Sequence, residues 1–338
     1  MRTIAIAVLV LILLPVVACG GGEEKPAATA TPSLTASSTP STASPTVTSE
    51  MTPSPASATP PPQVSVPKGK IAFVSRRDEN YEVYLVSPEG DLNLTKNPAE
   101  DIDADVSPDG NKIAFASNRQ GTYHIYVMNI DGTELRSLTD SDVDDFTPEW
   151  SSDGAHIAFT RAGSLMLMDS DGGNVQRIAQ GKPETTASPC EGAAFLGGWS
   201  PDGQELTFYT ASAVKNVGEV CTIGIDGLDL TVVAADPPAY YVEPSWSPDG
   251  EWIAYRFIDP ESDNYEIYKV RTDGTSRTNL TNNPGRDIEP DWSPDGKWIV
   301  FASDRLGDMD LFIVKEDGSD VARITTAPGK DSDPSWGP

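Results

Sequence analysis

Two positions in a repeated sequence pattern carry carboxylates, and they are the first candidates for chemistry. Both are counted back from a recurring residue, found as Trp150, Trp199, Trp246, Trp292 and Trp336, with Val106 in the equivalent place. Five residues before it, four of the six copies carry an aspartate: Asp101, Asp145, Asp287 and Asp331. Three residues before it, four copies carry a carboxylate: Asp103, Glu243, Glu289 and Asp333.

A ring of carboxylates concentrates negative potential. Such a ring can receive a basic peptide, or it can hold a hard cation such as Ca²⁺ through oxygen ligands. Each carboxylate can equally cap its own turn or pair with a nearby arginine, such as Arg77, Arg119 or Arg305. The residue types leave partner binding, cation binding and local structure all open.

Other catalytic side chains are scarce in the sequence. His124 and His156 are the two histidines, and both stand where other copies hold assorted polar or large residues, so we expect them at the surface. Neither a Gly-x-Ser-x-Gly nucleophile elbow nor a Gly-rich phosphate loop occurs. We therefore expect no enzymatic activity. The alternative is a carbohydrate-active hydrolase or lyase that depends on carboxylates alone.

The net charge of the chain limits its partners. It has 51 acidic and 24 basic residues, a formal charge of −27. Nucleic acids and anionic lipid surfaces both attract cationic proteins. We expect no nucleic-acid partner, and membrane contact only through an N-terminal lipid.

The carboxylates lie in a long internal repeat. Ile71, Ile113, Ile157, Leu206, Ile253 and Ile299 open similar apolar runs at spacings of 42, 44, 49, 47 and 46 residues. Residues 288–325 show one unit: IEPDWS, KWIVFAS, MDLFIVK and VARIT are four strand-like segments, here called strands A to D. SPDG and EDGSD are turn sequences between them. This period and content are typical of propeller blades.

The two ends of the repeat complete each other. The first unit begins at strand B, Lys70–Ser75, while residues 333–336 form a strand A with no further strand after it. We predict an all-β, six-bladed propeller of four-stranded antiparallel blades over residues 68–338. The C-terminal strand would pair with the N-terminal blade and close the ring. The repeated tryptophans are expected to lie in the core between blades.

The units resemble the TolB-type propeller repeat, which is similar to WD repeats. The resemblance rests on SPDGNKIAFASNR, HIYVMNIDG and SLT within residues 107–139, and on near-copies of SPDG across residues 68–338. It implies the propeller fold. TolB itself carries an α/β domain ahead of its propeller, whereas this chain is expected to have a stalk in that place.

The N-terminal region reads as an export and anchoring segment. Residues 1–18 have the pattern of a secretory signal, and Val16-Val17-Ala18-Cys19 resembles the lipobox of bacterial lipoproteins. We expect Cys19 to be lipidated. Residues 19–67 are rich in Pro, Ser, Thr and Ala and should form an extended stalk. The expected location is extracytoplasmic, anchored at the cell surface or on the periplasmic face.

The fourth unit departs from the repeat through a longer entry loop that contains Cys190. Cys221 is expected at the start of its strand C, at the same end of the blade. We predict a Cys190–Cys221 disulfide, which an exported protein can form. The apolar stretch beside it is a second candidate binding surface.

These expectations combine into one function. We expect a monomeric, non-catalytic propeller that binds a protein or peptide partner, of basic character, through an acidic mouth. No cofactor is expected, with Ca²⁺ at the mouth left open. A structural component of the cell envelope is a further alternative.

Overall fold

The computed structural model describes residues 67–180, 190, 192–212, 217–236, 239–262 and 264–338. The predicted signal peptide, Cys19 and the stalk lie outside these residues. In the described part of the chain, no helix is long and apolar enough to cross a membrane.

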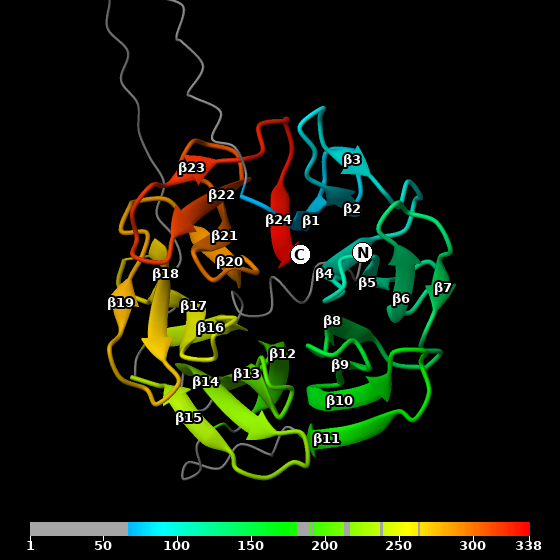
Figure 1. Ribbon diagram of the computed structural model, residues 1–338, viewed down its shortest axis with the longest axis horizontal. Helices are drawn as coiled ribbons and strands as arrows, with labels where there is room; N and C mark the ends of the chain where they lie inside the picture. Colours follow the sequence, from blue (N-terminus) through cyan, green and yellow to red (C-terminus); the bar gives the residue numbers. More distant parts are fainter. Residues whose placement is uncertain (1–66, 181–189, 191, 213–216, 237–238, 263) are drawn as a thin grey trace, which may run out of the picture. The chain divides into compact units, whose positions relative to one another are not determined.

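Six four-stranded antiparallel sheets form a closed ring (Figure 1). Each sheet is one blade, and its strands A to D follow one another outward from the centre of the ring. Blade 1 contains β24 (Asp331–Gly337), β1 (Lys70–Ser75), β2 (Glu82–Leu85) and β3 (Leu92–Asn93). Blade 2 contains β4 (Asp101–Val106), β5 (Lys112–Ser117), β6 (His124–Asn129) and β7 (Arg136–Ser137). Blade 3 contains β8 (Asp145–Trp150), β9 (His156–Arg161), β10 (Ser164–Asp169) and β11 (Gln176–Gln180).

The remaining three blades follow the same order. Blade 4 contains β12 (Ala193–Trp199), β13 (Glu205–Ser212), β14 (Val217–Gly224) and β15 (Thr231–Ala234). Blade 5 contains β16 (Tyr240–Trp246), β17 (Trp252–Asp259), β18 (Asn264–Arg271) and β19 (Thr278–Asn279). Blade 6 contains β20 (Asp287–Trp292), β21 (Trp298–Ser303), β22 (Asp310–Lys315) and β23 (Ala322–Arg323).

The predicted ring closure is confirmed. β24 pairs with β1 in antiparallel register, with Ile71 opposite Trp336 and Ser75 opposite Asp331. The two ends of the repeat therefore share one sheet, and no strand edge remains at the seam. Trp336 is 4% exposed and packs in the cluster that contains Ile71.

Strand B of each blade is covered on both sides by neighbouring blades. Its residues are therefore apolar in an unbroken run rather than in alternation. Phe73, Phe115, Phe159 and Phe301 occupy equivalent places in four of these strands, and each is 0% exposed. Four of the five repeated tryptophans are buried as expected of core residues, with Trp150 at 8% and Trp292 at 4%, whereas Trp246 is only partly buried.

The SPDG segments are turns that also join neighbouring blades. Oδ1 of Asp109 accepts hydrogen bonds from Ser107 Oγ at 2.6 Å and from the Asn111 N–H at 3.0 Å. Gly110 has a φ of 68°, a conformation that favours glycine. In the A–B turn of the next blade, a Cβ placed on Gly154 would lie 3.4 Å from the Pro108 ring. Neighbouring A–B turns therefore lie in contact around the ring.

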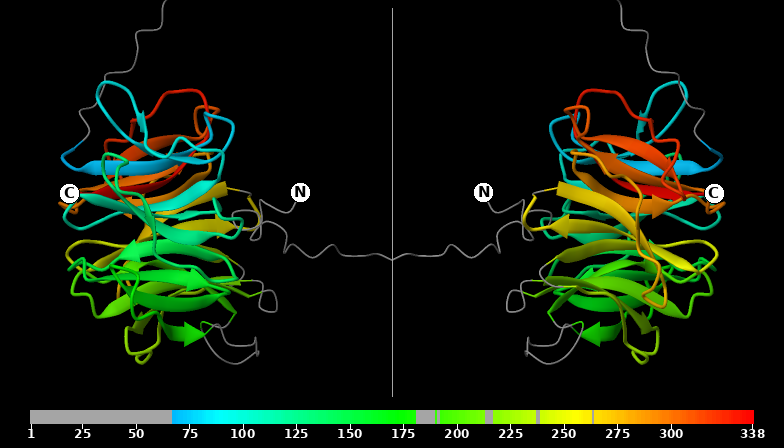
Figure 2. Two further views of the ribbon diagram at one scale, coloured as in Figure 1. Left: turned by 90° about the vertical axis from the view of Figure 1, so that its right-hand side faces the viewer. Right: turned by 90° about the vertical axis from the view of Figure 1, so that its left-hand side faces the viewer.

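The two faces of the ring carry different connections. Since adjacent strands are antiparallel, the A–B and C–D turns lie on one face, here called the turn face. The B–C loops and D–A connections lie on the opposite face, here called the loop face. Pro338, at the C-terminal end of the chain, contacts Gly110 on the turn face (Figure 2).

Blade 4 differs from the expectation in one respect. β13 and β14 each have eight residues. Cys221 is therefore the fifth residue of β14 and not its first, because the strand extends further toward the loop face than the sequence indicated.

Candidate functional site

The first carboxylate position forms buried ion pairs. Asp287 is 0% exposed, and its carboxylate accepts hydrogen bonds from Arg305 Nη2 at 2.9 Å and Ser303 Oγ at 2.6 Å. The Arg305 guanidinium lies 5.1 Å from the Phe301 ring centre and 4.9 Å from that of Phe312. The same pairing recurs in three other blades, as Arg119–Asp101, Arg161–Asp145 and Arg77–Asp331.

These pairs correct the expected acidic mouth. Asp101, Asp145, Asp287 and Asp331 are all fully buried and matched by an arginine, so they offer no surface to a partner. The local-structure interpretation holds for this position. The arginine lies at the end of strand B or two residues beyond it, where it can reach the first residue of strand A.

The second carboxylate position remains accessible. Asp103, Glu243, Glu289 and Asp333 are partly exposed, and each has a positive φ between 47° and 56°. The register with strand B shifts there, as in a β-bulge. The Asp103 carboxylate accepts the Thr147 N–H of the next blade at 2.9 Å, and that of Glu289 accepts the Asp333 N–H at 2.7 Å.

A third position was missed in the sequence. Asp105, Glu149 and Asp291 stand one residue before the reference residue and are partly exposed. Asp105 accepts the Trp150 N–H at 2.7 Å, and Asp291 accepts the Trp336 N–H at 2.7 Å. Residues two apart in a strand face the same side, which was the available signal. The pattern was not evident in the sequence because the other three blades have glycine or serine at this position.

The second and third positions together give seven carboxylates that surround the axis of the ring, here called the axial carboxylates. All lie on the innermost strands, which contact one another around the ring (Figure 1). Glu149 on blade 3 interacts electrostatically with Asp291 on blade 6, across the ring. The axial carboxylates are Asp103, Asp105, Glu149, Glu243, Glu289, Asp291 and Asp333.

Burial and mutual repulsion disfavour charge on several of the axial carboxylates. Burial raises the pKa of Asp103 to about 6 and that of Asp105 to about 7, with the charges of Glu289 and Asp291 adding to the respective shifts. Burial likewise raises the pKa of Asp291 to about 6. The pKa of Glu149 is raised well above its usual value, by burial first and then by Asp105. The site is therefore poised to exchange protons near neutrality.

Two basic residues lie near the axial carboxylates. Arg256 of β17 makes an ion pair with Glu243 at 2.8 Å, but burial outweighs it and raises the pKa of Glu243 to about 7. Lys330, just before β24, acts to lower the pKa of Asp333, which burial nevertheless raises well above its usual value. The negative charge of the site is thus only partly compensated.

Metal binding is the other expectation for the mouth. Among the residues that the structure describes, no group of three or more His, Cys, Asp or Glu side chains is placed to hold an ion. Five of the axial carboxylates accept a backbone N–H of a neighbouring strand: Asp103, Asp105, Glu243, Glu289 and Asp291.

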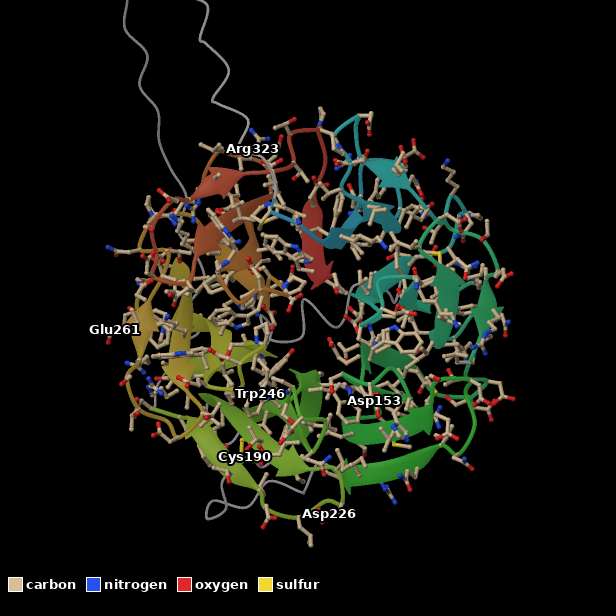
Figure 3. All side chains as sticks on the ribbon, viewed as in Figure 1. Asp153, Cys190, Asp226, Trp246, Glu261 and Arg323 are labelled. Carbon is tan, nitrogen blue, oxygen red and sulfur yellow. A yellow bond between two sulfur atoms is a disulfide. The ribbon has the colours of Figure 1, made fainter. Side chains whose placement is uncertain are left out.

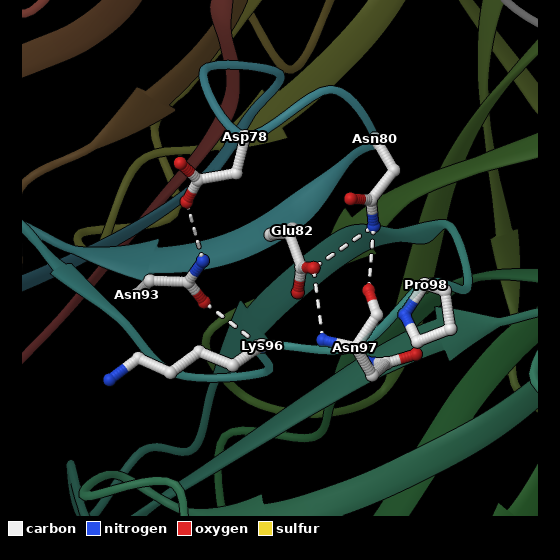
Figure 4. A pocket seen from close by; sticks show the side chains of 7 residues that line it. All are labelled: Asp78, Asn80, Glu82, Asn93, Lys96, Asn97 and Pro98. Atoms are coloured by element: carbon white, nitrogen blue, oxygen red, sulfur yellow. Dashed lines mark hydrogen bonds between the residues drawn. The ribbon is translucent and has the colours of Figure 1, made fainter.

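An open pocket of about 380 Å³ on blade 1, lined mainly by polar side chains, is a second candidate site (Figure 4). Its side chains mainly bind one another: Glu82 accepts hydrogen bonds from Asn80 Nδ2 and the Asn97 N–H, both at 3.0 Å. Blade 5 repeats this bond from Asn264 to Glu266 at 2.7 Å. These groups therefore fix the D–A connection. The lining residues are Asp78, Asn80, Glu82, Asn93, Lys96, Asn97 and Pro98.

The histidines offer no catalytic pair. His124 is 5% exposed, so its expected surface position is wrong: it takes the buried slot in β6 that Glu82 takes in β2. His156 is half-buried, with Nε2 3.8 Å from Asp169 Oδ1. The two residues begin different strands, β6 and β9, of neighbouring blades.

Exposed negative charge gathers on the turn face instead. The A–B turns present Asp109, Asp153, Asp202, Asp249 and Asp295, and the C–D turns present Asp131, Asp171, Asp226, Asp273 and Asp317. Figure 3 shows Asp153 nearer the axis and Asp226 at the rim. Hydrogen bonds from Ser107 hold the pKa of Asp109 below its usual range, and those from Thr133 do the same for Asp131. This face thus remains ionised over a wide pH range.

The expected Cys190–Cys221 disulfide is present in the structure, with Cα atoms 6.3 Å apart (Figure 3). Both residues are buried in the blade 4 cluster with Leu196 and Phe208. The Cys190 N–H also donates to Glu219 Oε2 at 2.7 Å. The bond thus ties the entry of blade 4 to its strand C.

Replacing both Cys190 and Cys221 by serine is expected to lower the free energy of unfolding by about 3–4 kcal/mol. The bond closes a loop of about 30 residues, which restricts the unfolded chain. Urea denaturation of the two proteins measures the difference. Equal midpoints would show that blade 4 does not depend on the bond.

Acidification from about pH 8 to about pH 5 is expected to raise the thermal unfolding midpoint. Asp103, Asp105, Glu243 and Asp291 have raised pKa values when folded, so their contribution to stability is present below the unfolded value of about 4 and is lost as the pH rises through 6 to 7. The turn-face aspartates act oppositely, but only below about pH 4. Calorimetry at constant ionic strength tests this, and a midpoint that is higher at pH 8 contradicts it.

Comparisons with known proteins agree with this architecture. A family model described as TolB beta propeller domain matches residues 48–164 and 160–338. An uncharacterized protein of Agrobacterium fabrum is 30% identical over 159 residues, which are 42% of this chain and 52% of that protein. The chain therefore spans about half the length of this curated relative.

Solved structures share the fold. TolB from Acinetobacter baumannii aligns with a TM-score of 0.66 at 20% identity, over 80% of this chain and 67% of that one. A putative TolB from Agrobacterium tumefaciens aligns with a TM-score of 0.60 at 21% identity, over 78% and 90%. An oligogalacturonate lyase in complex with manganese gives 0.52 at 16% identity, over 77% and 74%. At these identities the likeness concerns the fold alone.

Proposed function

Because the chain belongs to the TolB β-propeller domain family, we propose that it is an extracytoplasmic, non-catalytic binding protein whose axial carboxylates receive a basic segment of a protein partner. The family supports a binding role of the periplasmic type. The partner and the axial site are the finer parts of the proposal. The signal-like residues 1–18 and the lipobox-like segment ending at Cys19 support export and lipid anchoring.

The observation that carries the proposal is the partial exposure of the axial carboxylates. The carboxylates of the first position are each paired with a largely buried arginine, so their charge is already balanced within the fold. The Glu149 carboxylate, by contrast, has no hydrogen-bond or ion-pair partner among the described residues. Beside it, a Cβ placed on Gly198 would meet no atom within 4 Å, so blade 4 leaves room near this carboxylate.

A lysine or arginine side chain suits this site. Its charge would offset the repulsion that disfavours ionisation of the axial carboxylates. A long side chain can also reach the axis while its own backbone stays outside the ring. The partner is therefore proposed to present a flexible cationic segment rather than a broad, flat surface.

A carbohydrate-active enzyme remains the second candidate. The oligogalacturonate lyase shows that a similar fold can carry such chemistry. Carboxyl groups with raised pKa values are also suitable general acids. Against an enzyme stand the inter-blade hydrogen bonds of Asp103, Asp105, Glu289 and Asp291, which commit these carboxylates to structure.

Binding of a fluorescent pentalysine peptide to the full chain tests the proposal. The axial variant Asp105→Asn/Glu149→Gln/Asp291→Asn is expected to bind at least about tenfold more weakly than the parent at low salt. The matched turn-face variant Asp131→Asn/Asp273→Asn/Asp317→Asn likewise replaces three acidic residues by amides and should bind like the parent. Equal losses in both variants would reduce the effect to net charge and refute the axial site.

A further inference from the structure

We propose that the axial carboxylates form a pH-dependent binding site. Its affinity for the basic segment of the partner rises as the pH changes from mildly acidic to neutral. The inference rests on the proposed function and adds its regulation. It concerns when the site is charged, whereas the proposed function concerns what the site binds.

The first support is the fixed geometry of the axial carboxylates. Glu243 Oε2 accepts the Glu289 N–H at 3.0 Å, and Glu289 Oε2 accepts the Asp333 N–H at 2.7 Å. Glu243 and Glu289 are therefore each held by the strand that carries the next carboxylate. Such groups cannot move apart as charge develops, so they lose their protons in successive steps.

The second support is the identity of the charged groups around the site. Arg256 of β17 faces Glu243, and Lys330 lies near Asp333. Tyr209 of β13 also interacts electrostatically with Glu243, but it is neutral near neutrality because burial raises its pKa far above the usual value. Tyr123, just before β6, interacts in the same way with Asp103 and is neutral near neutrality because burial raises its pKa.

At the third position, no basic residue contributes to the pKa of Asp105, Glu149 or Asp291. Asp105 and Asp291 accept only neutral donors: Ser335 Oγ at 2.9 Å and Ser245 Oγ at 2.8 Å, besides backbone N–H groups. Glu149 has neither. A cation from outside is thus the natural complement of this layer once it ionises.

The pH window follows from the carboxyl groups themselves. Burial raises the pKa values of Asp105 and Glu243 to about 7 and those of Asp103 and Asp291 to about 6. Each group is neutral below its pKa and anionic above it. The site therefore gains negative charge between about pH 5.5 and pH 8, while turn-face aspartates such as Asp131 remain ionised throughout. A change in binding affinity within this pH window therefore comes from the axial carboxylates and not from the rest of the acidic surface.

Binding and proton release should be coupled. A lysine ammonium at the axis favours the anionic form of its neighbours, so its arrival displaces carboxyl protons into solvent. The release can be measured near pH 6.5 by titration calorimetry in buffers that differ in their enthalpy of protonation.

The test is the affinity of the full chain for pentalysine between pH 5.5 and pH 8. The parent and the turn-face variant should bind on the order of tenfold more tightly at pH 8, with proton release near pH 6.5. The axial variant should show little dependence on pH. Glu149→Gln alone, which removes no hydrogen bond, should reduce the dependence even if the triple variant folds poorly. A constant affinity in the parent, or the same dependence on pH in the axial variant, would overturn the proposed pH-dependent binding.

A failure of the proposed function would look different. If pentalysine does not bind at any pH, the binding role fails, and a ¹³C NMR titration of the carboxyl groups then decides the proton inference alone. Axial midpoints between 6 and 7 would keep it. Midpoints that all lie below about 5 would overturn it.

Discussion

Deletion of residues 331–338 is expected to abolish cooperative folding of the propeller. The deletion removes β24, so the inner edge of β1 loses its partner strand along Lys70–Ser75. It also leaves Arg77, whose side chain is 13% exposed, without Asp331, and it empties the space that Trp336 fills beside Ile71. An unpaired apolar strand at the seam is in addition a site for aggregation.

Circular dichroism on heating and size-exclusion chromatography measure this outcome. The truncated chain should show no cooperative transition and should elute as aggregates. Leu306→Ser, which changes a residue that is 64% exposed, should unfold like the parent and serves as the control. A truncated monomer with the parent's transition would contradict closure of the ring by β24.

Asp287→Ala is expected to lower the free energy of unfolding by about 3–5 kcal/mol. The Arg305 side chain is 16% exposed, and without Asp287 its guanidinium would be a largely buried charge with no counterion. Ser303 Oγ and Asn283 Nδ2 would also lose their acceptor. Urea denaturation gives the value.

A double-mutant cycle separates the ion pair from simple loss of contacts. Asp287→Ala/Arg305→Met removes both charges, so it should cost clearly less than the sum of the two single changes. Asp295→Ala on the turn face removes a half-exposed charge and should change stability by no more than about 1 kcal/mol. An additive cycle would show that the two charges of the pair are not coupled.

The fold could be predicted from the sequence because each blade repeats the same short patterns of turn and strand residues. SPDG encodes a turn wherever it stands, and the apolar run after it encodes a strand buried on both sides. The sequence of residues 333–336 identified a strand A without its partners, and the structure places that strand against β1. Closure follows from counting strands and requires no knowledge of side-chain contacts.

The site could be predicted only in part. The spacing located Asp101 and Asp103 alike, but it could not show that the β-bulge at Asp103 turns one toward the axis while the other faces Arg119. Both outcomes depend on contacts between strands far apart in the sequence. Glu149 was missed for a similar reason, since its importance comes from Asp105 and Asp291 on other blades. His124 was misplaced because a polar residue in a strand C can be buried when the D–A connection covers it.

The central claim is that the axial carboxylates bind a protein partner, and proximity crosslinking on intact cells tests it most directly. The parent, the axial variant and the turn-face variant would be compared at equal abundance. A crosslinked protein that is present with the parent and the turn-face variant, and lost with Asp105→Asn/Glu149→Gln/Asp291→Asn, is the predicted result. The same crosslinks in all three proteins would contradict the claim and direct attention to the loop face of blade 4 or to an enzyme assay.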